Sequence, residues 1–146
     1  MPDGRNLSRS NRLGPSEPLK VLVIDDDAIA LAEMTERLSA AGYKVTNLSS
    51  PIGASRVIAH DGIDVVVIDV QMPSIRGDRL AALFRSNPKL GRLGVILVTA
   101  ASEEEIADLA AKGGADFVLS KADLNPLPGR VRDSHVTRNR SGVPPG

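Results

Sequence analysis

The sequence of 146 residues contains no cysteine and no tryptophan, and its aromatic residues are limited to Tyr43, Phe84 and Phe117. Without cysteine the chain forms no disulfide, no thiolate zinc site and no thiol nucleophile, a composition typical of a reducing compartment. So few aromatic rings also exclude a nucleic-acid surface that stacks successive bases on side chains. The core of this protein must therefore be aliphatic.

Long hydrophobic runs are absent as well. No segment approaches the length of a membrane-spanning helix, and the first eighteen residues hold only Leu7 and Leu13 as large apolar side chains. The sequence therefore predicts neither a signal peptide nor a membrane anchor, and a cytoplasmic location is expected. With 42% hydrophobic and 25% charged residues, a chain of this length is predicted to form one globular domain.

The net charge is zero, but the charges are unevenly distributed. Residues 1–20 carry four Lys or Arg against two acids, residues 126–146 carry four Arg against one acid, and the segment between them has an acidic excess of five. The four arginines near the C-terminus are Arg130, Arg132, Arg138 and Arg140, too few to predict electrostatic binding of nucleic acid. The acidic excess in the middle of the chain is the more informative feature.

Between residues 19 and 120, short β-branched runs alternate with segments of helical periodicity. This alternation is typical of a parallel sheet whose strands are connected by helices. Five strands are predicted, at residues 21–24, 43–48, 65–68, 95–98 and 117–119. The runs at 21–24, 65–68 and 95–98 are continuously apolar, as strands covered on both faces require, whereas the run at 43–48 alternates and is predicted to lie at an edge.

Four helices between these strands are predicted from capping signals and apolar stripes. Gly42 is expected at the C-terminal end of the first, and Ser50 followed by Pro51 is expected to begin the second. The third carries its apolar residues between positions 80 and 84. Ser102 and Glu105 form a capping box at the start of the fourth.

No fifth helix is predicted. Pro126 and Pro128 interrupt the segment that follows the last strand, and no apolar stripe comes after them. Residues 126–146 are therefore expected to form a disordered tail that contains Arg and Pro. Residues 19–125 are expected to form the folded domain, and residues 1–18 a flexible arm.

Polar side chains follow the predicted strands at the edge where the carboxyl ends of parallel strands meet and ligands bind. They are Asp25, Asp26 and Asp27 after the first strand, Asp69 after the third, Thr99 after the fourth and Lys121 after the fifth. Three carboxylates about 5 Å apart repel one another by about 3 kcal/mol per pair at an effective dielectric of about 20. Lys121 supplies one positive charge, and the remaining deficit predicts a hard divalent cation with oxygen ligands, Mg²⁺ or Mn²⁺ in its place.

Asp69 is the candidate nucleophile of this cluster. Its carboxylate can attack a phosphoryl donor if the cation and Lys121 neutralise the phosphoryl oxygens and Thr99 donates a hydrogen bond to them. The product of this reaction is an acyl phosphate. An acidic run after a strand is, by itself, more often a solvated loop, and the combination with Asp69 is what favours a metal site.

Four segments carry these residues, namely 21–27 (VLVIDDD), 64–73 (DVVVIDVQMP) with Gly77, 95–100 (VILVTA) and 114–121 (GADFVLSK). In this order they resemble the receiver domain of two-component response regulators. The resemblance spans about 100 residues. It implies a flavodoxin-like α/β fold, in which an open five-stranded parallel sheet has the strand order 2-1-3-4-5.

The resemblance also implies a function for the acidic cluster. A sensor histidine kinase or a phosphotransfer protein would phosphorylate Asp69 in the presence of Mg²⁺, and the product would act on a downstream protein target. Asp26, Asp69 and the backbone carbonyl of Gln71 would hold the metal, and Asp25 would act through a bound water. Thr99 would turn toward the phosphoryl group, and Lys121 would pair with it.

Two of the departures from the family pattern bear on the fold. Val118 occupies the position, three residues before Lys121, where the family usually has an aromatic residue, and Phe117 stands one place earlier. The second departure is the missing last helix. Its absence leaves one face of the sheet partly bare unless a partner, such as a second copy of the chain in a homodimer, covers it.

Three functions remain open at this point. The leading one is a stand-alone receiver, which acts as a phosphorylation-dependent binding switch without an output domain of its own. The second is a phosphatase of the haloacid-dehalogenase type, which would use Asp25 and Asp27 as an Asp-x-Asp pair, although Ile29 and the short chain do not fit that family. The third is a degenerate receiver that only binds partners.

Overall fold

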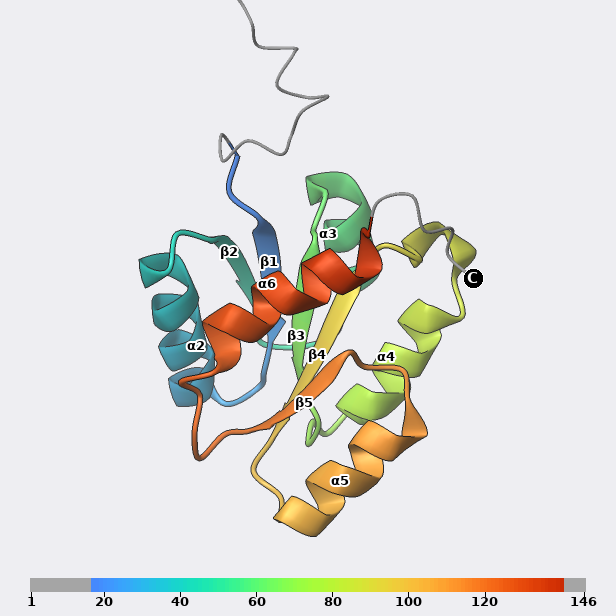
Figure 1. The fold of residues 1–146 in the computed structure, drawn as a ribbon. Helices are drawn as coiled ribbons and strands as arrows, with labels where there is room; N and C mark the ends of the chain where they lie inside the picture. Colours follow the sequence, from blue (N-terminus) through green and yellow to red (C-terminus); the bar gives the residue numbers. More distant parts are fainter. Residues whose placement is uncertain (1–16, 141–146) are drawn as a thin grey trace, which may run out of the picture.

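The computed structural model describes residues 17–140. The flexible arm predicted for residues 1–18 lies almost wholly outside this part of the chain, as do the last six residues of the predicted tail. The elements are β1 (Lys20–Ile24), α2 (Ala28–Ala40), β2 (Lys44–Leu48), α3 (Ala54–Asp61), β3 (Val65–Asp69), α4 (Gly77–Arg85), the 3-10 helix η1 (Pro88–Leu90), β4 (Gly94–Thr99), α5 (Glu103–Lys112), β5 (Phe117–Ser120) and α6 (Leu127–Arg138). The five strands form one parallel sheet in the order β2-β1-β3-β4-β5, so the predicted fold class is confirmed (Figure 1).

β1, β3 and β4 form the centre of the sheet, as their continuous apolar sequences predict. Every residue of β3 and β4 is buried, and in β1 only Lys20 is not. β2 and β5 lie at the two edges and are mostly half-buried. Ile24 pairs with Ile68 and Asp69 pairs with Val98 in neighbouring strands, so the carboxyl ends of β1, β3 and β4 meet at one edge of the sheet.

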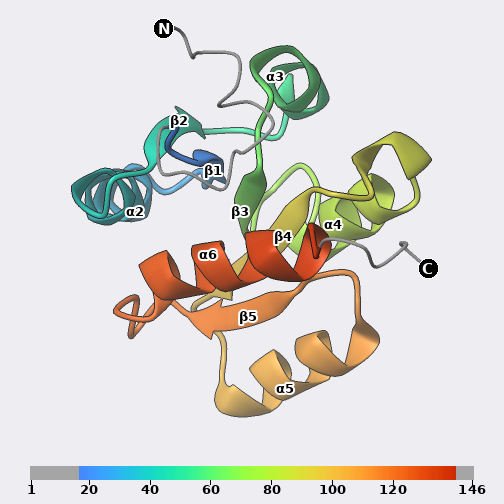
Figure 2. The ribbon, with the colours of Figure 1, turned by 45° about the horizontal axis from the view of Figure 1, so that its top comes forward.

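Helices cover both faces of the sheet (Figures 1 and 2). Because alternate residues of a strand point to opposite faces, Val21 and Val23 pack against α2 and α6, whereas Leu22 and Ile24 pack on the side of α3, α4 and α5. Burying one such aliphatic side chain contributes about 1.5–3 kcal/mol. The helices supply Ala30, Met34, Leu38, Leu127 and Val131 to the first layer and Ala54, Ile58, Leu80, Ala81, Phe84 and Leu109 to the second.

The prediction of a disordered tail from residue 126 is wrong, because residues 127–138 form the helix α6. Pro126 is its N-cap residue and Pro128 lies in its first turn, where the backbone nitrogen needs no partner within the helix. Its buried residues are Leu127, Val131 and Ser134, which share one face. With a serine as the third member, this stripe is too weak to recognise in the sequence.

The fifth helix removes the reason for two further expectations. α6 lies across the sheet over β4 and contacts α2, so the face that was expected to be bare is covered by the chain itself (Figure 2). The homodimer expected through that face therefore has no exposed surface to form on. The degenerate receiver was inferred from the missing helix and has no support in the structure.

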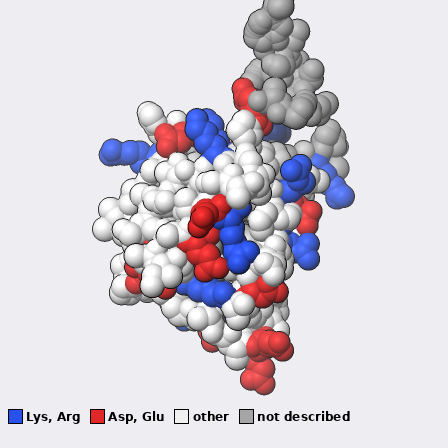
Figure 3. Space-filling view, turned by 90° about the vertical axis from the view of Figure 1, so that its left-hand side faces the viewer, with Lys and Arg blue, Asp and Glu red and all other residues white. Residues whose placement is uncertain are grey.

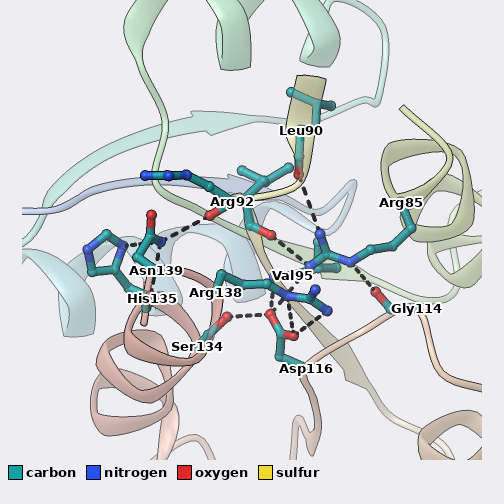
Figure 4. A network of polar contacts seen from close by, with 11 residues as sticks. Arg85, Leu90, Arg92, Val95, Gly114, Asp116, Ser134, His135, Arg138 and Asn139 are labelled. Atoms are coloured by element: carbon teal, nitrogen blue, oxygen red, sulfur yellow. Dashed lines mark hydrogen bonds and ion pairs between the residues drawn. The ribbon is translucent and has the colours of Figure 1, made fainter. Parts of the chain in front are cut away.

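The carboxylate of Asp116, which precedes β5, connects α6 to α4 and β4 (Figure 4). Asp116 Oδ2 accepts hydrogen bonds from Ser134 Oγ at 2.7 Å and from the Val95 backbone nitrogen at 2.9 Å, and Oδ1 accepts one from Arg138 Nε at 2.8 Å. Arg85 Nη2 lies 3.4 Å from Asp116 Oδ2, and its guanidinium also donates to backbone carbonyls before β4 and before β5. These five residues, Asp116, Arg85, Val95, Ser134 and Arg138, are called the Asp116 network below.

The starts of α3 and β2 differ from the prediction. Ser50 does not cap α3, which begins at Ala54 after Gly53 in the left-handed conformation at φ 86°. The Ser50 hydroxyl instead accepts a hydrogen bond from the Ile52 backbone nitrogen at 3.0 Å, within a turn. Tyr43 precedes β2, and its hydroxyl donates to the carbonyl of Pro128 in α6 at 2.7 Å.

The predicted capping box of α5 is half formed, because Ser102 Oγ accepts a hydrogen bond from the Glu105 backbone nitrogen at 3.3 Å. Three glutamates, Glu103, Glu104 and Glu105, occupy the first turn of α5, where the helix dipole favours negative charge. α5 begins at the lower end of the molecule in Figure 1, and acidic side chains project there in Figure 3.

Within residues 17–140, no helix combines the length and the apolar character that crossing a bilayer requires.

Candidate functional site

Three carboxylates converge at the carboxyl ends of β1 and β3. Asp69 is the last residue of β3, Asp25 follows β1 directly, and the exposed fractions of these two residues are 2% and 0%. Asp26 is exposed at the mouth of the site. One carboxylate oxygen from each of Asp25, Asp26 and Asp69 lies within 4.8 Å of the others. The adjacency of β1 and β3 thus brings together groups that are 44 residues apart in the chain.

Lys121 supplies the positive charge among these carboxylates. Its Nζ lies 2.7 Å from Asp25 Oδ2 and 3.0 Å from Asp69 Oδ1. The backbone nitrogen of Lys121 donates to the carbonyl of Thr99 at 2.8 Å, which fixes the lysine just beyond the end of β5. The ammonium therefore bridges the two buried carboxylates.

The pKa values of Asp69 and Lys121 are shifted because one ammonium lies between two buried carboxylates. Burial raises the pKa of Asp69 and the neighbouring charge of Asp25 raises it further, and the hydrogen bond and charge of Lys121 offset these effects only in part. Burial alone would lower the pKa of Lys121, but hydrogen bonds and charges from Asp25 and Asp69 outweigh it and raise that pKa. Lys121 thus stays protonated, and one ammonium does not fully compensate two buried carboxylates.

The donor set fits a hard divalent cation. Asp25 Oδ2 and Asp69 Oδ1 are buried, and the contact described for each of them within residues 17–140 is the ion pair with the Lys121 ammonium. Together with Asp26, these groups offer carboxylate oxygens only, which are the ligands that Mg²⁺ prefers. The acidic cluster is therefore consistent with Mg²⁺ binding.

Asp27 does not belong to the cluster. Its backbone nitrogen donates to Asp25 Oδ1 at 2.9 Å, and its own Oδ1 accepts from the Ile29 nitrogen at 3.2 Å as the N-cap of α2. Its carboxylate thus stabilises the start of a helix. An Asp-x-Asp pair of the phosphatase type needs this carboxylate to face the reacting group, and the capping role directs it to the backbone instead.

Thr99 and Gln71 are joined by a contact that the sequence did not predict. Thr99 ends β4 and is fully buried, and its hydroxyl donates to Gln71 Oε1 at 3.1 Å. The same hydroxyl oxygen accepts from the Ala101 backbone nitrogen at 3.1 Å. The family resemblance implies that the Gln71 carbonyl holds the metal, that the residue at the Gln71 position influences how long the phosphoryl group survives, and that Thr99 turns toward that group. A side-chain bond between the end of a strand and a loop leaves no periodic signal in the sequence.

Val118 and Phe117 point to opposite faces of β5. Val118 packs against the cluster under α3, α4 and α5, and Phe117 packs in the α2 and α6 layer, where Arg130 lies 5.1 Å from its ring centroid. Phe117 therefore does not replace the aromatic residue that the family pattern places at Val118.

A family model for the response regulator receiver domain matches residues 21–132. The chain belongs to this family. As a receiver domain it is a signalling phosphoacceptor, not a catalytic enzyme, so the phosphatase alternative is set aside.

Among its relatives, protein RcaC of Microchaete diplosiphon is 35% identical over 118 residues, which are 80% of this chain and 18% of RcaC. The probable transcriptional regulatory protein TcrX of Mycobacterium tuberculosis is 33% identical over 135 residues, 90% of this chain and 55% of TcrX. The solved response regulator TrrA of Thermotoga maritima, in complex with Mg²⁺-BeF, has a TM-score of 0.68 and 27% identity over 79% of this chain and 97% of TrrA. The receiver domain thus spans only part of the two curated relatives.

Gly77 permits the close packing of the start of α4 against the backbone at the end of β3. Its nitrogen donates to the Val70 carbonyl at 2.8 Å, and a Cβ at this position would overlap the backbone carbonyl of Asp69. We expect Gly77→Ala to destabilise the receiver domain by about 1–3 kcal/mol, because the backbone of Asp69 and Val70 must move to make room for the added methyl group. Urea denaturation measures the loss.

Gly129→Ala in α6 is the matched control, because a Cβ there meets no atom within 4 Å. This variant is expected to be neutral or more stable, since Ala is the better helix former. Equal losses in both variants would contradict the packing role of Gly77.

The raised pKa of Asp69 predicts the pH dependence of the metal-free protein. The folded state holds this proton more tightly than the unfolded state, so its contribution to stability is complete below the ordinary Asp pKa of about 3.9 and is lost as pH rises through the higher folded pKa. In EDTA at pH 7, Asp69→Asn is therefore expected to be more stable than the wild type by more than the ~0.5 kcal/mol of a surface change.

The comparison uses urea denaturation of both proteins between pH 4 and pH 8. Adding Mg²⁺ should stabilise the wild type, by about 2.7 kcal/mol at 100 times the dissociation constant, and should stabilise Asp69→Asn much less. A wild type that is more stable than Asp69→Asn in EDTA at pH 7 would show that Lys121 compensates both carboxylates.

Proposed function

We propose that this receiver domain accepts a phosphoryl group on Asp69 from a phosphohistidine of a sensor histidine kinase or a phosphotransfer protein. The observation that carries the proposal is the pair of buried carboxylates, Asp25 and Asp69, bridged by Lys121 at 2.7 and 3.0 Å. Receiver domains act with histidine kinases, which supports this class of donor.

In the transfer, an Asp69 carboxylate oxygen forms a bond to phosphorus while the bond between phosphorus and the donor nitrogen breaks. Lys121 is already between Asp25 and Asp69, so its ammonium is placed to neutralise charge on the incoming phosphoryl oxygens. Thr99 holds one hydroxyl proton that it can donate to those oxygens. The donor imidazole leaves as a neutral ring, with its one proton either already on the other ring nitrogen or taken from water, and no residue of the receiver domain changes its protonation state.

Mg²⁺ is the cation that the proposal requires. Asp26, Asp69 and the Gln71 backbone carbonyl would hold it, and Asp25 would act through a bound water, with Mn²⁺ as a substitute. The ion would supply positive charge to the phosphoryl oxygens when bound. TrrA, which has the same fold, was solved with Mg²⁺-BeF, and this supports the choice of metal.

The test is phosphorylation by a small donor followed by mapping of the modified residue. Incubation with acetyl phosphate and Mg²⁺ is expected to raise the intact mass by one phosphoryl group, and peptide mapping after reductive trapping of the acyl phosphate should place it on Asp69. EDTA should prevent the change. A stable label on a hydroxyl group, or a mapped site at Asp25 or Asp26, would contradict the proposal.

We further propose that the protein works as a stand-alone, phosphorylation-dependent protein-interaction switch. The mass of the protein isolated from its native cells tests it. A mass of 15.4 kDa agrees with a single receiver domain, and a larger mass would identify an attached output domain.

A further inference from the structure

We propose that the Gln71 side chain is a positioning residue that holds the Thr99 hydroxyl away from Asp69, so that a phosphoryl group must displace Gln71 before Thr99 can bind it. The inference rests on the function proposed above, because it concerns the donor that Thr99 would offer to a group on Asp69. It starts from the bond between Thr99 Oγ1 and Gln71 Oε1 at 3.1 Å.

A threonine hydroxyl has one proton and therefore donates to one acceptor at a time. In this structure the Gln71 amide oxygen takes that proton. The Ala101 backbone nitrogen donates to the same hydroxyl oxygen at 3.1 Å and so occupies one of its lone pairs. Gln71 and a phosphoryl group on Asp69 thus compete for a single proton.

The two partners differ in their freedom to move. Thr99 is fully buried at the end of β4, and its backbone carbonyl accepts from the Lys121 nitrogen at 2.8 Å. Gln71 is exposed in the loop between β3 and α4, two residues beyond Asp69, so its amide can exchange Thr99 for water. Thr99 stays near the site in both states, and Gln71 is the group that leaves.

This arrangement stabilises the unphosphorylated state with a bond that the phosphorylated state gives up. The net value of one such neutral hydrogen bond corresponds to a factor of about two to ten in an equilibrium constant. Gln71→Met keeps the side-chain length and the backbone carbonyl but removes the acceptor. The variant should bind beryllofluoride, a stand-in for the phosphoryl group, about two- to tenfold more tightly than the wild type at saturating Mg²⁺.

Thr99→Val provides the matched background, because valine has nearly the shape of threonine but no proton to donate. In Thr99→Val, the additional change Gln71→Met is expected to leave the beryllofluoride affinity unchanged, since no hydroxyl remains to be released. The four proteins form a double-mutant cycle whose coupling reports the bond between Thr99 and Gln71. A general effect of the Gln71→Met change on access or packing would appear in both backgrounds and would overturn the proposal.

The titration is followed by NMR spectra of the full chain. In the absence of Mg²⁺ and beryllofluoride, Gln71→Met should also shift the Thr99 methyl and Ala101 amide signals, because the hydroxyl loses its acceptor. Unchanged signals would show that the bond does not form in solution, and the proposal would be wrong whatever the affinities.

The outcomes separate this inference from the proposed function. If the wild type binds beryllofluoride in a Mg²⁺-dependent manner and Gln71→Met binds it equally well, the role of Gln71 is overturned and the phosphoacceptor assignment stands. If the wild type binds Mg²⁺ but no beryllofluoride, the phosphoacceptor assignment fails, and the role of Gln71 fails with it.

Discussion

Asp69→Asn is expected to lose the whole of the phosphoryl label that acetyl phosphate and Mg²⁺ add to this protein. The asparagine amide has the shape of the carboxylate but carries no anionic oxygen to attack phosphorus. Asp25 keeps its contact with Lys121, 2.7 Å in the wild type, so the rest of the site remains paired. The loss is measured as the absence of any increase in intact mass under conditions that label the wild type.

The control is Asp133→Asn on α6. The exposed carboxylate of Asp133 pairs with Arg130 at 2.8 Å, and neither residue belongs to the acidic cluster. This variant should label like the wild type. Far-UV circular dichroism of Asp69→Asn shows whether it is folded, so a lost label is not confused with a lost fold. If Asp69→Asn still gains one phosphoryl group, the acceptor is another residue.

Asp116→Ala is expected to lower the free energy of unfolding by about 3 kcal/mol, and the melting temperature by roughly 10 °C. The change removes the anion that lies between Arg85 and Arg138 and leaves Ser134 Oγ and the Val95 nitrogen without their acceptor. Water reaches part of the network, since the Arg138 side chain is 32% exposed, and this places the loss near the lower end of the range for a broken buried pair.

Asp133→Ala serves as the control in the same helix. Its ion pair with Arg130 is exposed, with side-chain exposures of 45% and 49%, so removing it should cost less than about 1 kcal/mol. In Asp116→Ala, the exchange rate of backbone amide hydrogens should increase more in α6 than in β3 or β4. If the two variants lose equal stability, the Asp116 network does not hold α6 on the sheet.

The sequence alone predicted the sheet well, for a simple reason. A strand covered on both faces must be apolar at every position, and residues 21–24, 65–68 and 95–98 meet this requirement without help from the rest of the chain. The boundaries of α3 were less accurate because Ser50 and Pro51 fit either a helix start or a turn, and Gly53 decides between them through its left-handed conformation.

The residues that form the acidic cluster could also be predicted from the sequence. Parallel topology brings strand ends to one edge, so Asp25, Asp69 and Lys121 had to lie near one another once the strands were assigned. The capping role of Asp27 could not be predicted in this way. Whether a carboxylate after a strand faces a cation or caps the following helix depends on the backbone conformation of a single residue.

The sequence by itself therefore determined the parallel sheet, its order through the family pattern, and the set of side chains at its carboxyl edge, because these depend on local composition and on topology. Only the tertiary structure decided that residues 127–138 form a helix, that Asp116 joins this helix to α4, and that the Thr99 proton belongs to Gln71. α6 is stabilised by contacts with residues distant in the chain, and its own sequence has two prolines at its start and only a weak apolar stripe. Such contacts arise only when the chain has folded, which is why no pattern within the segment could predict them.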